Sequence, residues 1–474
     1  MNTAKRIAKN TAVLTTARII SMILSLVLTA LIARHLGDIN FGKYSFAFAF
    51  TSLFVILSNF GLHTLALREI ARDKKLAPKY LGNIFPIKII LSIVVFGLIV
   101  VTINLLNYPS DTKLAVYIMG LYIIMTSFTQ FHISVFRAFE QMEYEALTTV
   151  LGRVVLLSLG LIVLFSGGGL IAIIFVFLIG AIFEAVFTLS LLTRRFVKFR
   201  LQWDIKFLKH LMKKALPFGL AGIFGVIYFR IDMVMLSAMK GDAAVGWYSA
   251  AYRLLEGVVF IPAFFAASLF PVMSKFFVSS RSSLKLYYSK SVEYLLFIAI
   301  PLVIGTTILA DKIIVFLYGI EYANSIIALK VLIWAVFFIF LNYIMGTVLV
   351  SINRERLNLV NSGFCVLLNI SLNLFLIPSL SYVGASIATI ITEASLFIIS
   401  FCFISKYLHL LSFHKLLLRP LIASLVMGCV IFCLKNLNLF ILTALGIVVY
   451  VGMLYLTVSQ ENREFFRKLI HNKK

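Results

Sequence analysis

Ten charged side chains stand inside long apolar runs of this 474-residue chain. A charge in the hydrocarbon core of a bilayer is costly, so each of them is a candidate for function. Basic groups outnumber acidic ones among them, and the set therefore favours an anionic ligand. The ten are Arg18, Lys88, Arg153, Arg230, Arg253, Lys330, Glu184, Asp232, Glu256 and Glu393.

Four of these arginines are candidates for binding that ligand, because a guanidinium group is a planar fork that matches phosphate oxygens. Arg18 lies about two turns into the first apolar run, and Arg230 lies midway along another. These two are the strongest candidates, and Arg153 stands near the end of its run. Arg253 precedes Glu256 by three positions, which favours an internal ion pair slightly over a ligand contact.

Three carboxylates are candidates for ion coupling, namely Asp232, Glu393 and Glu184. A buried carboxylate can hold a proton near neutral pH, and release of that proton can drive a transport step. For Glu184 and Glu393 a polar helix-packing contact is the favoured alternative. The two lysines, Lys88 and Lys330, are expected to extend their ammonium groups toward a membrane interface.

The elements that position these charges are membrane-spanning helices. Hydrophobic residues make up 61% of the chain and charged residues 13%, whereas globular chains average about half apolar and about a quarter charged. A span needs about 20 mostly apolar residues, and continuous runs exclude the alternating pattern of β-barrel strands. The fold class is therefore an all-α polytopic membrane protein with about 14 transmembrane helices. They are expected at 10–33, 42–62, 81–106, 114–136, 146–166, 169–192, 215–239, 246–273, 291–317, 325–351, 357–377, 382–405, 416–434 and 437–458.

The basic residues predict the orientation. With the N-terminus in the cytoplasm, 31 of the 43 lysines and arginines lie on the cytoplasmic side, which is the positive-inside bias of a multi-pass protein of the cell membrane with both termini inside. The net charge of +24 is therefore no sign of nucleic-acid binding. The largest basic cluster, 194–214, is favoured as a topology determinant and linker, with an amphipathic segment on the anionic leaflet as the alternative. The first run, preceded by Lys5, Arg6 and Lys9, is expected to be a retained span rather than a signal peptide.

One phrase occurs twice. GDINFGKYSFA occupies 37–47 and GDAAVGWYSAA occupies 241–251. Each copy follows the first span of a six-span unit, so both units have the same orientation and form parallel repeats facing a central cleft. The Gly-Asp pair predicts a tight extracytoplasmic turn, because glycine tolerates positive φ and Asp bonds its own backbone. The expected parts are an N-terminal lobe at 1–193, a basic linker at 194–214, a C-terminal lobe at 215–405, and a terminal helix pair with a basic tail at 406–474.

Four further stretches carry a resemblance to a known family. They are ARHLGDINFGKYSFAFAFTSLFVILSNFGLHTLALREIAR, VFRAFEQMEYEAL, YFRIDMVMLSAMKGDAAVGWYSAAYRLLE and NISLNLFLIPSLSYVGASIATIITE. With these the chain resembles the polysaccharide repeat-unit flippases of the Wzx type, which serve O-antigen, capsule and exopolysaccharide assembly. Their superfamily also holds the MATE drug exporters and the lipid II flippases. The resemblance implies transfer of an isoprenoid-pyrophosphate-linked oligosaccharide from the inner to the outer leaflet, with a terminal helix pair that forms a groove for the lipid tail.

Two other functions remain open at this stage: a MATE-type cation-coupled drug antiporter and a membrane glycan polymerase. The chain has no GxxxxGK[ST], GxSxG, HExxH or Cys-x-x-Cys motif, so the expectation is a non-enzyme without cofactor or metal. The four cysteines, at 365, 402, 429 and 433, lack the companions of a metal site. Expected partners are the lipid-linked oligosaccharide, membrane lipids, a proton or sodium ion, and other polysaccharide-assembly membrane proteins.

The topology is directly testable with reporter fusions. Fusions at Lys43, Lys240 and Lys435 should report an extracytoplasmic location, and one at Lys206 a cytoplasmic location, because the basic residues gather on the side of Lys206. Paired alkaline phosphatase and green fluorescent protein reporters distinguish the two sides. A cytoplasmic signal at Lys240 would contradict the model of two parallel repeats.

Overall fold

The structure, a computed structural model, describes residues 3–198, 200–408 and 411–457, and the side chains within them except those of 3–13, 217, 221 and 457. Every regular element in these ranges is helical. Twelve of the helices are long and apolar enough to cross a membrane. The predicted fold class, an all-α multi-pass membrane protein, is confirmed. The N-terminal basic side chains and most of the predicted basic tail lie outside the described residues.

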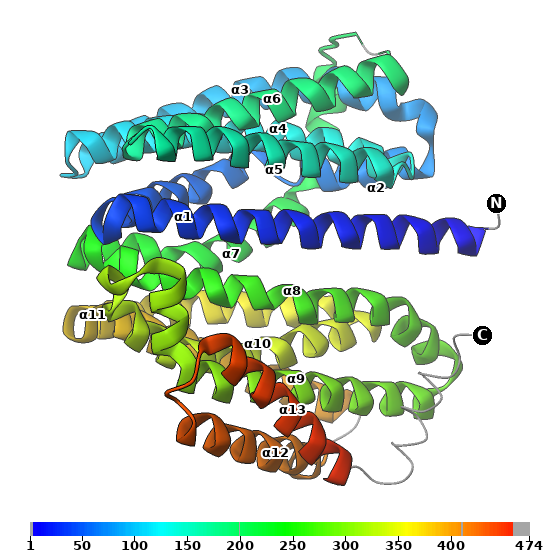
Figure 1. Cartoon of the computed structure of the whole chain (residues 1–474). Helices are drawn as coiled ribbons and strands as arrows, with labels where there is room; N and C mark the ends of the chain where they lie inside the picture. The colour runs from blue at the N-terminus through cyan, green and yellow to red at the C-terminus, as the bar shows by residue number, and fades with distance from the viewer. Residues whose placement is uncertain (1–2, 199, 409–410, 458–474) are drawn as a thin grey trace. The chain divides into compact units, whose positions relative to one another are not determined.

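The chain forms two compact units, Met1–Ser249 and Ala250–Lys474. Figure 1 shows the helices of both units, coloured from blue at the N-terminus to red at the C-terminus. Unit 1 holds the helices α1 (Thr3–Asn59), α2 (Leu62–Arg72), α3 (Ala77–Leu105), α4 (Ser110–Ala138), α5 (Met142–Phe165), α6 (Leu170–Arg195) and α7 (Ile205–Lys240), and the short 3-10 turn η1 (Lys74–Leu76). The unit boundary falls within α8 (Asp242–Ser279).

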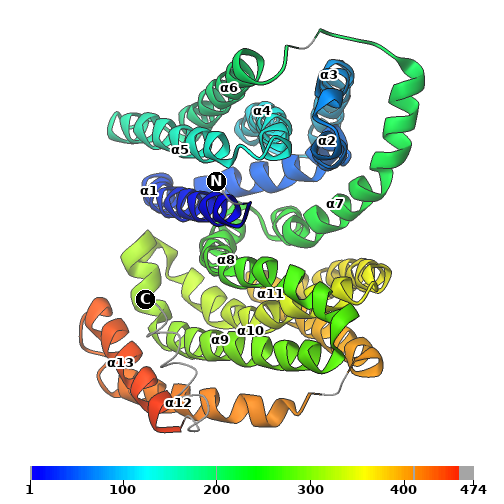
Figure 2. The ribbon, with the colours of Figure 1, turned by 90° about the vertical axis from the view of Figure 1, so that its right-hand side faces the viewer.

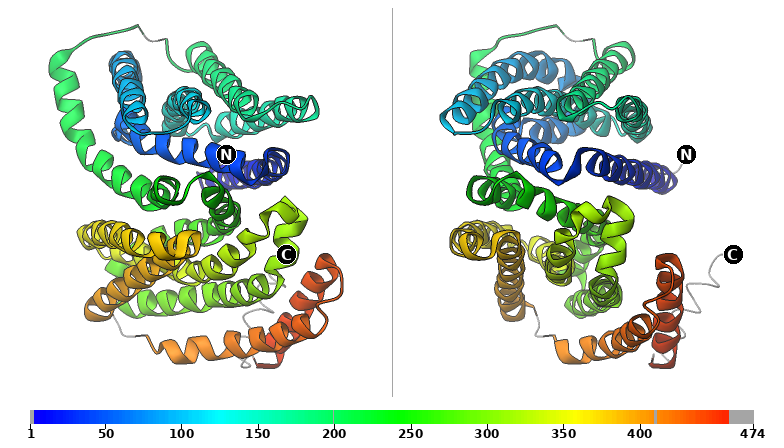
Figure 3. Two further views of the ribbon diagram at one scale, coloured as in Figure 1. Left: turned by 90° about the vertical axis from the view of Figure 1, so that its left-hand side faces the viewer. Right: turned by 60° about the vertical axis from the view of Figure 1, so that its left-hand side comes forward.

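Unit 2 holds the rest of α8 and the helices that follow it: α9 (Arg281–Tyr318), the 3-10 turn η2 (Ile320–Tyr322), α10 (Asn324–Ser351), α11 (Glu355–Tyr407), α12 (Phe413–Cys433) and α13 (Leu439–Thr457). Within this unit α9 is the shared packing partner, since α10, α12 and α13 all contact it. The terminal pair α12 and α13 lies against α9, as Figure 3 shows in orange and red. Leu309 of α9 packs in the cluster that joins the pair, with Ala423, Met427 and Leu442.

Fourteen predicted spans correspond to twelve spanning helices because two helices each carry two spans. In α1 the residue Gly37 leaves the helical region at φ 71° and ψ 172°. In α11 the residue Ser381 does so at φ 52° and ψ −133°. Spans were expected on the two sides of each break. No loop separates the two spans of α1 or the two spans of α11, so a single residue makes each turn.

Unit 1 is built around α4. This helix contacts α1, α2, α3, α5 and α6, and Figure 2 shows it nearly end-on among them. α7 packs along α1 and α2, which is why it clusters with unit 1, although it begins within the predicted linker 194–214 and continues into the predicted C-terminal lobe. The lobes expected from the repeat, 1–193 and 215–405, divide the chain differently from these two units, and they stay a prediction.

The repeated phrase has the same backbone form in both copies. Gly37 has φ 71° and Gly241 has φ 81°, a region that favours glycine. The carboxylate of Asp38 accepts a hydrogen bond from the next backbone N–H at 2.8 Å. The positive φ is confirmed at both glycines. The predicted bond from Asp to its own backbone is confirmed in the first copy alone, since the buried Oδ1 of Asp242 has no hydrogen-bond partner among the described residues.

The two copies also pack on each other, and each uses its second glycine to do so. A Cβ on Gly42 would overlap the carbonyl oxygen of Asp242, and a Cβ on Gly246 would overlap the carbonyl oxygen of Asp38. The contact is therefore reciprocal, backbone against backbone. A side-chain bond reinforces it, because the Trp247 indole N–H donates to the Asp38 carboxylate at 2.8 Å. Both glycines are required by this close approach and not by a special φ.

Alanine at either crossing glycine should be destabilising. Overlap with a backbone carbonyl forces helices apart, and overpacking of this kind costs about 1–3 kcal/mol. We expect Gly42→Ala and Gly246→Ala each to lower the thermal unfolding midpoint of the purified protein. Gly97→Ala is the matched control, because a Cβ there meets nothing within 4 Å. Equal midpoints for all three variants would contradict the crossing.

Candidate functional site

A cavity of about 440 Å³ lies inside unit 1. This volume falls within the range of roughly 300–1,000 Å³ that small-ligand pockets occupy. It is lined by side chains of five helices, α1, α2, α4, α5 and α6, and most of the lining residues are polar or charged. The lining residues are Leu14, Ala17, Arg18, His63, Thr64, Leu67, Thr126, Thr129, Gln130, Ile133, Ser134, Arg137, Glu145, Ala146, Thr149, Arg153 and Glu184.

Helical periodicity places these side chains on the cavity wall. On α5 the lining residues Glu145, Thr149 and Arg153 follow one another at intervals of four, which puts them on one helix face. On α4 the lining residues run from Thr126 to Arg137 at intervals of three and four. The polar stripes of two neighbouring helices therefore meet in one space.

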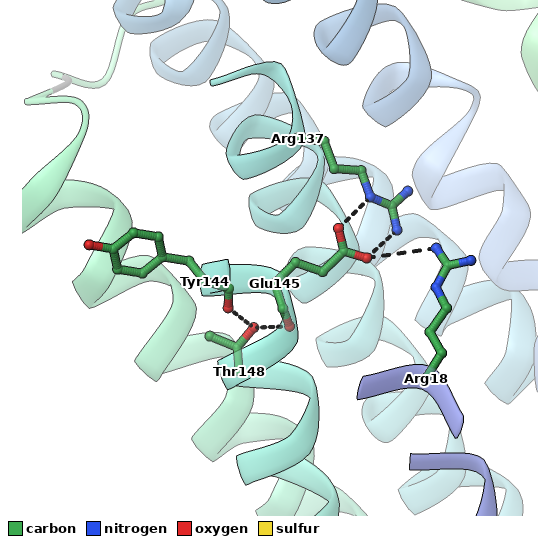
Figure 4. A network of polar contacts seen from close by, with 5 residues as sticks. All are labelled: Arg18, Arg137, Tyr144, Glu145 and Thr148. Atoms are coloured by element: carbon green, nitrogen blue, oxygen red, sulfur yellow. Dashed lines mark hydrogen bonds and ion pairs between the residues drawn. The ribbon is translucent and has the colours of Figure 1, made fainter. Parts of the chain in front are cut away.

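Glu145 is the shared counter-ion of two arginines. Its carboxylate accepts two hydrogen bonds from Arg137, from Nε at 2.7 Å and from Nη2 at 2.6 Å. Arg18 of α1 approaches the same carboxylate at 3.8 Å (Figure 4). The Glu145 side chain is 6% exposed, whereas that of Arg18 is 50% exposed. One buried carboxylate thus holds α1, α4 and α5 together at this wall.

Glu145 lies in the first turn of α5, and a threonine side chain hydrogen-bonds to the backbone of this turn. The Thr148 hydroxyl donates to the carbonyl oxygens of Tyr144 and Glu145 at 2.8 and 3.1 Å (Figure 4). The carboxylate stands in the first turn of the helix, where the aligned peptide dipoles favour negative charge. Glu145 is therefore stabilised both by its arginines and by its own helix.

Glu184 and Arg153 form the second charged part of the wall. Glu184 of α6 packs against Gly152 of α5, where a Cβ would come within 3.0 Å of its carboxyl carbon. Arg153, the next residue along α5, lines the same cavity. The lining then holds three arginines against two glutamates, so the cavity has a basic excess.

His63 of α2 adds a neutral polar group to the wall. Its Nε2 lies 3.2 Å from the hydroxyl of Thr64, and within the described part of the chain its buried Nδ1 has no hydrogen-bond partner. Burial lowers the pKa of His63, and the charges of Lys88 and Arg137 lower it further. The imidazole is therefore neutral at pH 7, and the basic excess of the cavity comes from arginines alone.

Lys88 does not reach an interface, so the expectation for this residue is wrong. Its side chain is 1% exposed. Its ammonium donates to the Asn59 side-chain oxygen at 2.6 Å and lies over the ring of Phe128 at 5.1 Å. An amide oxygen and an aromatic face replace water here, which lets a lysine stay inside the helix bundle. Lys330, by contrast, is exposed.

The predicted site residues fall into several places. Arg18, Arg153 and Glu184 line the one cavity. Arg230 and Asp232 lie elsewhere in unit 1. The guanidinium of Arg230 lies 5.0 Å over the ring of Phe48, and the buried Asp232 accepts a hydrogen bond from the Tyr248 hydroxyl at 3.0 Å.

The other two predicted residues lie in unit 2. Arg253 pairs with Glu256 at 3.0 Å, as their spacing predicted. Glu393 is buried, and its carboxylate and backbone oxygens both accept hydrogen bonds from the Asn342 amide, at 2.7 and 3.0 Å. Such a contact is typical of polar packing between helices, here between α10 and α11.

Three titratable residues of the cavity lining were not singled out from the sequence: Arg137, Glu145 and His63. Arg137 and Glu145 are eight positions apart and lie on different helices, so no single-helix spacing links them. Both stand in the stretch VFRAFEQMEYEAL, and that was the available signal. His63 follows directly after a predicted span, where a lone histidine has no distinctive pattern.

The fold defines a class, the multi-pass helical membrane proteins. The chain belongs, more specifically, to the family described as polysaccharide biosynthesis proteins, which it matches over residues 7–277. It also matches the MatE family over residues 217–375. These two findings confirm the resemblance seen in the sequence.

Relatives with curated descriptions are distant but cover most of the chain. The probable low-salt glycan biosynthesis flippase Agl15 of Haloferax volcanii is 23% identical over 431 residues, 90% of each chain. The capsular polysaccharide biosynthesis protein CapF of Staphylococcus aureus is 22% identical over 401 residues, 81% of this chain and 96% of its own.

Solved structures support the same fold. The lipid II flippase MurJ in an inward closed conformation aligns with a TM-score of 0.79 at 18% identity, over 97% of this chain and 99% of its own. An inward-facing MATE family multidrug transporter aligns with a TM-score of 0.69 at 15% identity, over 82% of this chain and 94% of its own. At these identities the likeness is one of fold.

The neutral state of His63 predicts a pH dependence of stability. Because its pKa is lowered in the folded protein, the unfolded chain takes up the proton first as the pH falls below the ordinary value of 6.5. Stability is then lost from about pH 6.5 downward, until the folded protein is protonated too. His63→Gln should reduce the fall in unfolding midpoint between pH 7 and pH 5.

The control is His414→Gln, which removes an exposed histidine. This variant should keep the parent's dependence on pH. An unchanged dependence in His63→Gln would show that the neutral imidazole contributes nothing to acid sensitivity.

Proposed function

We propose that this protein is a flippase that moves an isoprenoid-pyrophosphate-linked oligosaccharide from the inner to the outer leaflet of the cytoplasmic membrane. The family, the glycan-assembly relatives and the flippase fold support this function. The single observation that carries it within this chain is the arginine-rich cavity among apolar spanning helices. A cation-lined cavity in that setting suits an anionic headgroup whose lipid tail stays in the bilayer.

Arg18 and Arg153 are the proposed ligands of the pyrophosphate. Both line the cavity, and each can donate two parallel hydrogen bonds to phosphate oxygens. Arg137 is already held by Glu145 in a bidentate pair. Arg18 is half exposed beside the same carboxylate, so a phosphate group can take over this arginine without unpairing Glu145.

The cavity lies toward the basic side of the membrane. Arg137 and Glu145 flank the short connection between α4 and α5, and Arg18 stands near the start of the chain. Both regions are cytoplasmic in the topology that the basic residues favour. The proposed site would therefore load cargo from the inner leaflet, and alternating access between the two repeats would release it outside.

In this proposal the cargo is moved without being chemically changed. The chain would bind and release an intact lipid-linked oligosaccharide and would not be an enzyme. Its energy would come from a proton or sodium gradient or from the membrane potential. Asp232, Glu393 and Glu184 are the proposed coupling carboxylates, and other polysaccharide-assembly membrane proteins are the expected neighbours.

The second candidate function is cation-coupled export of a drug-like molecule. The MatE match over 217–375 favours it, and so do the two glutamates of the cavity. A cationic drug would need the acidic groups to outnumber the arginines, which they do not. Competition separates the two functions, because only an anion site is blocked by inorganic pyrophosphate.

Arginine variants test the anion site. Arg18→Gln and Arg153→Gln should each weaken binding of a short-chain isoprenyl pyrophosphate about tenfold or more, since a charge-assisted hydrogen bond contributes about 1.5–3 kcal/mol. Arg18→Lys should retain part of the affinity, because it keeps the charge and loses the fork. Calorimetry on the purified protein measures the affinities.

Three further variants make this test decisive. Arg72→Gln is the control, because Arg72 is 69% exposed and lies outside the cavity lining. Arg230→Ala and Arg253→Ala ask whether the other arginines predicted from the sequence contribute. Loss of binding in either of these, with normal binding in Arg18→Gln and Arg153→Gln, would move the anion site away from the cavity.

Coupling is tested with carboxylates replaced by amides. Each amide mimics a permanently protonated carboxylate, and the variants are Asp232→Asn, Glu393→Gln and Glu184→Gln. If the replaced residue carries the coupling proton, the variant should still bind cargo, but its transport should no longer respond to an imposed pH gradient. Transport is measured in proteoliposomes with and without the gradient. Full responses in all three would point to sodium or the membrane potential.

A further inference from the structure

The connection that leads from the end of α6 into the first turns of α7 has a basic face, and this face lies on the first turns of α7. Lys206, Lys209 and Lys213 follow at intervals of three and four and are exposed, so they share one side of the first turns of α7. Leu208 and Leu211 on the opposite side are buried. The lysines therefore face away from the protein and carry no packing role.

This connection is also fixed to the helix bundle rather than loosely tethered. The backbone N–H of Gln202 donates to the Gly82 carbonyl at 3.0 Å, and that of Asp204 donates to the Asn83 side-chain oxygen at 2.9 Å. Asn83 is fully buried. A Cβ on Gly82 would come within 2.5 Å of the Arg200 carbonyl oxygen, so glycine is required for the contact.

The anchor points set the depth of the connection in the membrane. Gly82 and Asn83 lie in the second turn of α3, after the polar first turn around Lys79 and at the start of the span predicted at 81–106. The start of a spanning helix is expected at the membrane–water interface. Residues 200–205 are held at this level.

Three apolar side chains project from the same place. Leu201, Trp203 and Ile205 are 67%, 53% and 57% exposed. Tryptophan prefers the headgroup level, where its ring is half in hydrocarbon. The one acid of the connection, Asp204, caps α7 by accepting the Phe207 N–H at 3.0 Å, so it belongs to the helix end and not to the basic face.

We propose that this surface, formed by Leu201, Trp203 and Ile205 with Lys206, Lys209 and Lys213, is a docking site for anionic phospholipids of the leaflet on its side of the membrane. The apolar side chains enter the headgroup region, and the lysines contact lipid phosphates. The combination of apolar insertion and basic charge is what binds an interfacial segment to anionic lipid. We name it the basic platform.

The basic platform gives residues 194–214 a role beyond topology. A linker needs neither a buried asparagine anchor nor exposed tryptophan, and charge bias alone requires no common face. Bound anionic lipid would hold the start of α7 at the leaflet while the spanning part of α7 stays in the bundle. This proposal is independent of what the protein transports.

The test is lipid selectivity of the full chain in bilayers. The protein is reconstituted in phosphatidylcholine, and spin-labelled phosphatidylglycerol and phosphatidylcholine are compared for the fraction immobilised at the protein. The parent should prefer phosphatidylglycerol, and 0.5 M salt should reduce that preference. The triple variant Lys206→Gln, Lys209→Gln, Lys213→Gln should reduce it about twofold or more in low salt.

A matched triple variant removes three exposed basic residues from the ends of other helices: Arg356→Gln, Lys406→Gln and Lys415→Gln. It should keep the preference. The unfolding midpoint in detergent checks that both variants are folded. The proposal is overturned if the platform variant keeps the parent's selectivity, or if both triple variants lose it equally, since the effect would then be one of overall charge.

A second readout locates the contact. Phosphatidylglycerol brominated near the headgroup should quench the emission of the parent more than that of Trp203→Phe, because Trp203 is placed at that depth. Equal quenching of the two proteins would also overturn the proposal.

Discussion

The arrangement of unit 1 depends on how charge is neutralised where water is scarce. Glu145 is nearly fully buried and accepts both hydrogen bonds of Arg137 while Arg18 approaches from a third helix. A lone buried charge is costly, whereas a paired and hydrogen-bonded one is tolerated. The site therefore keeps one firm pair for structure and additional arginines for a ligand, and this surplus is what makes the cavity suited to an anion.

A second constraint is the close crossing of the two repeated phrases. Gly42 and Gly246 each receive a backbone carbonyl of the other copy. This explains why both copies of the phrase carry two glycines at the same spacing. The first glycine makes a turn at positive φ, and the second leaves space for the backbone carbonyl of the other copy. A duplicated sequence is thus matched by a reciprocal contact, and the repeat is part of the packing as well as of the topology.

The sequence determined much of the fold and less of the site. Apolar runs predicted every spanning segment, because a bilayer leaves helices few alternatives, and φ at Gly37 and Gly241 followed from the turn motif. Arg18, Arg153 and Glu184 were identified by their cost in a membrane, yet their meeting in one cavity depends on how α1, α5 and α6 pack. Arg137 and Glu145 sit at helix ends, where a charge is inexpensive and unremarkable in sequence, and Lys88 is satisfied by a side-chain amide that no local pattern reveals.

The central claim, that the cavity of unit 1 receives the pyrophosphate, is tested most directly by a structure of the protein with a short-chain isoprenyl pyrophosphate bound. The account predicts phosphate density within hydrogen-bond distance of Arg18 and Arg153, with Arg18 moved off Glu145 and the Arg137–Glu145 pair intact. Phosphate density elsewhere in the molecule, with Arg18 still beside Glu145, would contradict it.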